Sequence, residues 1–238
     1  MEPDGGPASV LGTERSAPES FILKMKAAIS GTPLADEELP AQDISLGCLE
    51  FYLIRVGEAM NEGARMADVF DSYQETMDAA CAIFDGSLEE FRPAVQKKFA
   101  DAVPFDDILL LHRLTIHPLA RGQRLGLSVL KQAIHDWSSG CSLVVMKPFP
   151  LQFEGGAKNR PSWNELRFGD FLSDKATAHK RLTKYYERLG FQQLGRSQFY
   201  AICPRSWTPR AFDQQLRRNF TFPPALLAGS RTNHASSN

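Results

Sequence analysis

The sequence predicts an α/β (α+β) protein built on a mixed central sheet flanked by helices. Residues 106–116 and 141–149 are nearly continuous apolar runs, which is typical of strands buried on both faces. Between them, the apolar residues of 125–137 recur every three or four positions, as on one face of a helix. A strand, a crossover helix and a second strand make a β-α-β unit, so we expect the two strands to be parallel or nearly so.

The segments before this unit supply further elements. Residues 21–29 fit either a strand or a short helix, whereas 48–59 are rich in aromatic and β-branched residues and indicate a strand. Residues 66–84 carry apolar side chains at helical spacing. The segment 87–90 resembles a capping box that opens another helical stripe, and Pro93 marks a restart of that helix.

After the β-α-β unit the chain continues with a loop, a helix and two short strands. Residues 150–174 have no clear period and predict a long loop. Residues 175–191 have helical spacing and end at Gly190, and the runs 191–195 and 198–204 indicate two strands.

These elements suit one domain in a chain of 238 residues of which 43% are hydrophobic. Residues 1–19 are rich in Gly, Pro and Ser and predict a disordered N-terminal tail. Residues 20–204 are expected to form the domain, with a motif-bearing core at 106–203, and residues 205–238 a basic, partly disordered C-terminal tail.

The composition argues against several classes of partner. A formal net charge of −1 gives no general attraction to nucleic acid or to a membrane surface. No apolar run has the length of a membrane span, and the N-terminus lacks the features of a signal peptide. The cysteines lie far apart without metal-ligand spacing, so we expect reduced core thiols, no bound metal and a cytoplasmic location; they are Cys48, Cys81, Cys141 and Cys203.

The junction between the strand at 106–116 and the helix at 125–137 points to a bound anion. Its segment "ARGQRLG" brings two arginines and two glycines to the start of the helix. A helix N-terminus offers backbone N–H groups and partial positive charge, and glycine lets a phosphate approach closely. The segment has neither the Lys-Ser/Thr pair of a P-loop nor the three glycines of a dinucleotide fingerprint. A solvated turn is the alternative interpretation.

The pattern "RGQRLG" after a buried strand resembles the pyrophosphate loop of the GCN5-related N-acetyltransferase (GNAT) superfamily. Two further segments add to the resemblance: "LTIHP" ahead of the loop, and "YYERLGF" at 185–191, which is similar to the end of a helix in that family. The resemblance covers about residues 106–203 and implies an acyl-CoA N-acyltransferase-like fold. Arg124 departs from the pattern, because it stands where the family usually has its middle glycine.

The family also places two strands between its second helix and the strand before the loop. This sequence leaves little room for them there. We expect the strands at 21–29 and 48–59 to take their place from before the helices, the alternative being that they are lost.

The resemblance implies acetyl-CoA as co-substrate and no metal. The implied pyrophosphate-binding residues are Arg121, Gly122, Gln123, Arg124, Leu125 and Gly126, and the backbone of Leu114, Thr115 and Ile116 is implied to bind the pantetheine arm and the thioester oxygen. Tyr186, four residues before Gly190, matches the family tyrosine that faces the CoA thiol, and is implied to protonate the leaving thiolate. From the residues alone, Tyr185 is an equal candidate, and a core role is open for Tyr186.

His112 is the candidate general base. It lies two residues before Leu114 and is therefore expected to share that residue's face of the strand. A neutral imidazole can accept an ammonium proton directly or through water. A hydrogen-bonded core histidine is the alternative, and Asp106 and Asp107 are other candidates for the base.

The expected activity is direct transfer of an acetyl group from acetyl-CoA to an amine of a small molecule or a protein side chain. A non-catalytic acyl-CoA-binding sensor or interaction module with the same fold is the alternative. We expect the loop at 150–174 to be mobile in the empty protein and to order over the acceptor pocket, with a rigid decoration of the sheet as the other possibility.

Overall fold

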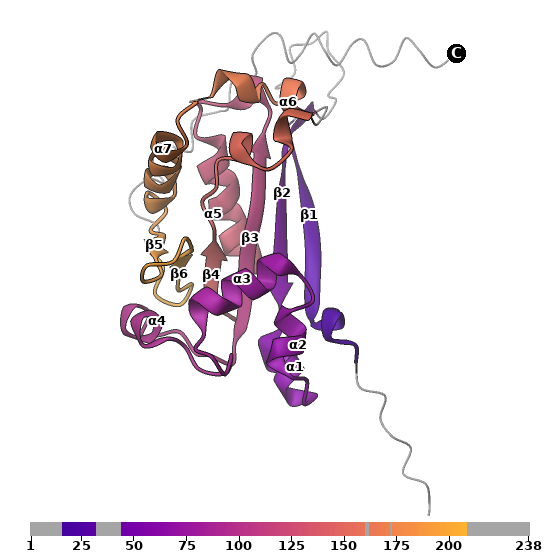
Figure 1. Cartoon of the computed structure of the whole chain (residues 1–238), viewed down its shortest axis with the longest axis vertical. Coiled ribbons are helices and arrows are strands. Elements are labelled where there is room, and N and C mark those ends of the chain that lie inside the picture. The colour runs from indigo at the N-terminus through magenta and orange to yellow at the C-terminus, as the bar shows by residue number, and fades with distance from the viewer. Residues whose placement is uncertain (1–15, 32–43, 160–161, 172, 209–238) are drawn as a thin grey trace, which may run out of the picture.

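The computed structural model describes residues 16–31, 44–159, 162–171 and 173–208. Six strands form one mixed sheet in the order β1-β2-β3-β4-β6-β5 (Figure 1). Only β3 and β4 are parallel among these described neighbours; the other pairs are antiparallel. The strands are β1 (Ile22–Gly31), β2 (Ile44–Ile54), β3 (Asp107–Ile116), β4 (Cys141–Met146), β5 (Gln192–Gln193) and β6 (Tyr200–Ile202).

Helices cover both faces of this sheet, so the predicted mixed sheet flanked by helices is confirmed. Figure 1 shows α3 crossing in front of the sheet and α5 lying behind it. One layer consists of α1 (Val56–Asn61), α2 (Met66–Phe70), α3 (Gln74–Ile83) and α4 (Pro93–Lys98), and the other of α5 (Leu125–Trp137) and α7 (Lys175–Glu187). The short elements are α6 (Ser162–Glu165) and the 3-10 turns η1 (Pro18–Phe21), η2 (Pro118–Ala120), η3 (Leu151–Phe153), η4 (Ala157–Asn159) and η5 (Phe168–Asp170).

The β-α-β unit has the structure that its sequence predicts. β3 and β4 are parallel, and α5 is the crossover helix with the predicted bounds of 125–137. Ile108 and Leu110 pack with the layer of α1–α4, whereas Leu109 and Leu111 pack with α5. Both faces of β3 are therefore buried over this stretch, which is why its sequence is apolar without alternation.

Both early strands belong to the sheet. Residues 21–29 are resolved as a strand, β1, and β2 lies between β1 and β3. The two strands thus precede the helices in the chain and still extend the sheet beside β3, as the preferred alternative expected. The predicted strand at 48–59 is wrong at both ends, because β2 begins at Ile44 and residues from Val56 onward form α1.

The single helix predicted over 66–84 is wrong, because the chain breaks between α2 and α3. Tyr73 has extended backbone angles there (φ −141°). The buried Thr76 hydroxyl bonds to the carbonyls of Phe70 at 2.6 Å and Tyr73 at 2.8 Å, so it satisfies backbone groups that the break exposes. Both helices pack on the same core, and the apolar spacing therefore continues across the break.

The predicted capping box at 87–90 is also wrong. Ser87 bonds to the Asp85 carboxylate instead, within a turn closed by a bridge between Phe84 and Phe91. The helix begins only at Pro93, the residue that marked its restart.

Residues 1–15 and 209–238, which hold most of both predicted tails, lie outside the described residues, as do 32–43, 160–161 and 172. Of the four free cysteines only Cys141 and Cys203 are buried, so the expectation of core thiols is wrong for the exposed Cys81 and the half-buried Cys48. Among the described residues, no helix combines the length and apolarity needed to cross a membrane.

Candidate functional site

The site forms where β3 and β4 separate. Their parallel pairing ends at Leu111 and Met146, while β3 continues to Ile116. Leu114, Thr115 and Ile116 pair with β2 on one side only, and in the described part of the chain no strand pairs with their other edge. These residues therefore present one backbone edge to a ligand.

A bulge in β3 decides which side chains face this gap. Glu50 of β2 pairs with Arg113 and Phe51 pairs with Leu111, so His112 is an extra residue on β3. The bulge reverses the alternation of faces, and Leu114 joins Leu111 on the side of α5. His112 instead packs against Tyr52 on the opposite face, with ring centroids 5.7 Å apart. The expectation that His112 shares a face with Leu114 is therefore wrong.

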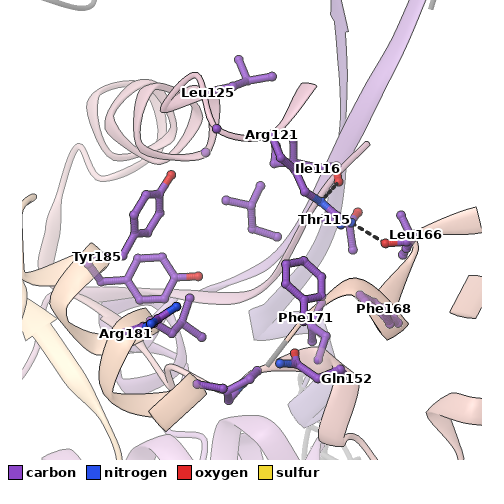
Figure 2. Close-up of a pocket in the computed structure, with 18 of the residues that line it drawn as sticks. Thr115, Ile116, Arg121, Leu125, Gln152, Leu166, Phe168, Phe171, Arg181 and Tyr185 are labelled. Carbon is purple, nitrogen blue, oxygen red and sulfur yellow. Dashed lines mark hydrogen bonds between the residues drawn. The ribbon is translucent and has the colours of Figure 1, made fainter. Parts of the chain in front are cut away.

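A cavity of about 680 Å³ lies over the open edge of β3 (Figure 2). This volume falls within the roughly 300–1,000 Å³ typical of ligand pockets. Its lining includes nine of the eleven residues predicted to take part in the site, namely Leu114, Thr115, Ile116, Arg121, Gly122, Arg124, Leu125, Gly126 and Tyr186. Gln123 and His112 are not part of this lining. The predicted loop, strand and tyrosine therefore do converge on one cavity.

The loop at 121–126 enters α5 through two residues with positive φ, Gly122 at 83° and Arg124 at 62°. Arg124 precedes the first residue of α5 in the left-handed conformation, which an L-residue adopts at a cost and glycine adopts freely. The backbone N–H groups of Leu125 and Gly126 belong to the first turn of α5, where no intrahelical acceptor is available. The turn therefore gathers backbone N–H groups at the start of α5, and Arg124 holds a strained conformation there.

We expect Arg124→Gly to be more stable than Arg124→Ala by about 1 kcal/mol in the free energy of unfolding. Both variants lose the side chain, but only glycine removes the strain of the left-handed backbone. Urea denaturation of the two purified variants measures the difference. Equal stabilities would show that the backbone at this position carries no strain.

Arg121 links the loop at 121–126 to residues 166–171, which lie on the other side of the cavity. Its guanidinium donates to the Ile116 carbonyl at 2.9 Å and to the Leu166 carbonyl at 2.7 Å, and it lies 4.6 Å from the ring centre of Phe171 (Figure 2). Arg121 is thus engaged with backbone acceptors, and its side chain positions residues 166–171 beside the cavity.

The segment 150–174 is a run of short turns in its described part, rather than an unstructured loop. Its residues Gln152, Leu166, Phe168 and Phe171 form one wall of the large cavity, opposite Tyr185 and Arg181 of α7 (Figure 2). From the sequence, this segment is expected to lie over the acceptor pocket. In the structure, most of its residues that face a cavity border the large one. Phe168 is buried and meets Trp163 edge to face with ring centroids 5.6 Å apart, so these two aromatic residues anchor the segment.

The charged residues that border the large cavity are mostly cationic. Arg121, Arg124, Arg181 and Arg188 border it, against the single carboxylate of Asp170. Arg181 and Arg188 lie on or at the end of α7 and were missed by the sequence analysis, because a basic helix surface has many causes. Such a lining favours a ligand with several negative charges.

The two tyrosines of α7 have different surroundings. The Tyr185 hydroxyl lies against the start of α5, where a Cβ built on Gly126 would be 2.8 Å from it. Tyr186 borders both the large cavity and a narrow hollow of about 30 Å³ in the gap between β3 and β4. Burial raises the pKa of Tyr186 and keeps its hydroxyl protonated at neutral pH. Of the two, Tyr186 is the one that reaches the gap.

A third hollow, of about 190 Å³, opens on the α3 side of the sheet. It shares His112, Arg113 and Lys147 with the narrow hollow, which in turn shares Leu114 and Tyr186 with the large cavity. The gap between β3 and β4 thus links hollows on opposite faces of the sheet.

Two ion pairs and one histidine–carboxylate contact surround the hollow on the α3 side. His112 Nε2 lies 3.8 Å from a Glu75 carboxylate oxygen, Lys147 lies 3.5 Å from Asp78, and Arg113 bonds to Glu154. Burial lowers the pKa of His112, and the negative charge of Glu75 opposes that shift. His112 is therefore neutral at neutral pH, the form that accepts a proton.

The two aspartates that were also candidates for the base do not reach the site. Asp107 begins β3 at the end away from the gap, where burial raises its pKa, and Asp106 is paired with Arg205. His117 caps η2 by accepting a hydrogen bond from the backbone N–H of Leu119 at 3.3 Å. No group of three or more His, Cys, Asp or Glu side chains that suits a metal ion occurs among the described residues.

Comparison with known protein families, with curated proteins and with solved structures found no match to this chain.

Proposed function

We propose that this protein is an acetyl-CoA-dependent N-acetyltransferase with an acyl-CoA N-acyltransferase-like fold, which moves the acetyl group directly to an amine. The observation that carries the proposal is the open edge of β3 beside a cationic cavity of about 680 Å³ at the start of α5. Free cysteines on the described chain suit a reducing compartment such as the cytoplasm.

Each part of the donor has a complementary group along the cavity. The pyrophosphate lies against the turn at 122–126, where backbone N–H groups, the helix N-terminus and the arginines carry positive charge. The pantetheine arm follows residues 114–116, whose unpaired edge offers backbone hydrogen bonds. This direction brings the thioester to the gap between β3 and β4, next to Tyr186.

The reaction at the gap needs three groups besides the reactants. Backbone N–H groups of β3 stabilise the thioester oxygen as it becomes negatively charged. The amine nitrogen attacks the carbonyl carbon, His112 accepts the amine proton, and the C–S bond then breaks. Tyr186 gives its proton to the departing thiolate and regains one from solvent. The amine enters from the hollow on the α3 side, where His112 lies.

The pH dependence of kcat/KM tests the role of His112. We expect kcat/KM to rise with pH through the pKa of His112, which burial holds below its ordinary value of about 6.5, and then to level off. Glu75→Gln removes a charge that raises this pKa, so the rising limb should move to lower pH. Pre-steady-state rates across a pH series measure the limb.

Asp78→Asn is the matched control, because Asp78 lies on the same helix but pairs with Lys147. Asp78→Asn should leave the rising limb of the pH profile of kcat/KM unchanged. A limb that stays unchanged in Glu75→Gln, or that moves equally in Asp78→Asn, would remove His112 from the role of base.

The activity itself is tested by calorimetry with acetyl-CoA, followed by thiol release over a panel of primary amines and lysine peptides. Binding together with amine-dependent thiol release supports the proposal. Binding without release from any amine would make the protein an acyl-CoA sensor, and no binding would overturn both functions.

A further inference from the structure

The narrow hollow of about 30 Å³ lies where the acyl group of a bound donor must end. Along β3 it follows the large cavity, and the two share Leu114, Phe149, Leu151 and Tyr186. A donor whose arm lies against residues 114–116 therefore directs its thioester into this hollow. This step rests on the proposed function.

The walls of the hollow on the α5 side are apolar and tightly packed. They are contributed by four different elements, with Leu49 from β2, Leu111 from β3, Leu130 from α5 and Met146 from β4, each no more than 5% exposed. Because all four belong to one core cluster, none can move aside without disturbing the packing of α5 on the sheet. The polar residues His112, Arg113 and Lys147 border the hollow toward the α3 side.

The size of the hollow limits what it can hold. Its volume of about 30 Å³ is two to three times the roughly 10–15 Å³ that a cavity needs to hold one water, which leaves room for a small acyl end such as a methyl group. An acetyl group ends in a methyl, whereas a longer acyl chain that extends toward α5 must displace a core side chain.

We propose that this hollow is the acyl pocket of the site and that Leu130 is the residue that limits the donor to acetyl. Leu130 is 1% exposed and reaches the hollow from the helix that also begins at the phosphate turn. Shortening this side chain extends the hollow into α5, away from the polar residues that face the amine.

The experiment compares Leu130→Ala with Leu127→Ala. Leu127 lies on the same helix, belongs to the same core cluster and is 0% exposed, but it lines none of the three hollows. Both variants lose the same atoms from the core, so general loosening affects them alike. The measurements are kcat/KM for acetyl-, propanoyl- and butanoyl-CoA, and equilibrium binding of the same thioesters by calorimetry.

We expect the unchanged protein to prefer acetyl-CoA over butanoyl-CoA by about 10–200-fold. Leu130→Ala should raise the ratio of butanoyl to acetyl turnover at least about tenfold, and Leu127→Ala less than about twofold. If an alanine variant does not fold, the pair Leu130→Val and Leu127→Val, read with propanoyl-CoA, replaces it.

The outcomes separate the pocket from the activity. Turnover of acetyl- and butanoyl-CoA at equal rates, or the same shift in both leucine variants, would overturn the acyl pocket while the transferase stands. In another outcome no thioester is turned over, but binding still favours acetyl-CoA and this preference still depends on Leu130. That outcome would overturn the transferase while the pocket stands.

Discussion

Replacing Tyr186 with phenylalanine is expected to lower kcat by about 10²–10⁴-fold, the usual loss when a general acid is removed. The ring stays in place between the large cavity and the narrow hollow, so the affinity for CoA should change little. Only the proton of the hydroxyl is lost, and burial keeps that hydroxyl protonated by raising its pKa. Single-turnover kinetics with acetyl-CoA and a reactive amine, together with calorimetry, separate the two effects.

Tyr185→Phe is the matched control. The Tyr185 hydroxyl lies against Gly126 at the start of α5 and does not border the narrow hollow, so its loss should leave kcat nearly unchanged. The reverse ranking of the two variants would transfer the role of acid to Tyr185. Two variants with full activity would show that neither tyrosine protonates the thiolate.

Gly126→Asp is expected to weaken CoA binding by about 100-fold or more. The substitution places a carboxylate at the start of α5, where the pyrophosphate is proposed to lie, and like charges brought together cost several kcal/mol. It also fills a tight space, because a Cβ on Gly126 would lie 2.8 Å from the Tyr185 hydroxyl and 3.4 Å from Leu114. Calorimetry with CoA measures the loss, and circular dichroism confirms that the variant folds.

Gly126→Ala separates size from charge. The methyl group meets the end of the Tyr185 side chain, which can shift, so we expect a much smaller loss than with aspartate. Unchanged affinity in a folded Gly126→Asp protein would place the CoA site elsewhere.

The β-α-β unit and the loop before α5 could be predicted because their signals are local. Burial on both faces makes β3 and β4 apolar throughout, and the spacing along α5 follows from one buried face of a helix. The stop after α7 is equally local: the helix ends at Glu187, three residues before the predicted Gly190, and the positive φ of 94° at Gly190 favours glycine there. Pro93 marked the start of α4 for the same kind of reason.

Other features could not be predicted, because distant parts of the chain decide them. The break between α2 and α3 leaves the apolar spacing intact, and Thr76 gives no sign in the sequence that it satisfies the carbonyls of Phe70 and Tyr73. The walls of the cavity at Arg181 and at 166–171 lie far along the chain from the loop they face. The hydrogen bond from Arg121 to the Leu166 carbonyl brings the loop and residues 166–171 together.

The sequence by itself determined the β-α-β unit, the glycines and arginines of the turn at 121–126, and the pair of tyrosines at the end of α7, because each follows from the spacing of neighbouring residues. Only the tertiary structure decided that His112 and Leu114 face opposite sides of the sheet. That reversal comes from a bulge, and a bulge exists only in the register between β3 and β2, two strands with more than fifty residues between their ends. The divergence of β3 and β4, which opens the hollows between the two faces, is likewise a property of how the strands pair, since a single strand cannot specify where its neighbour ends.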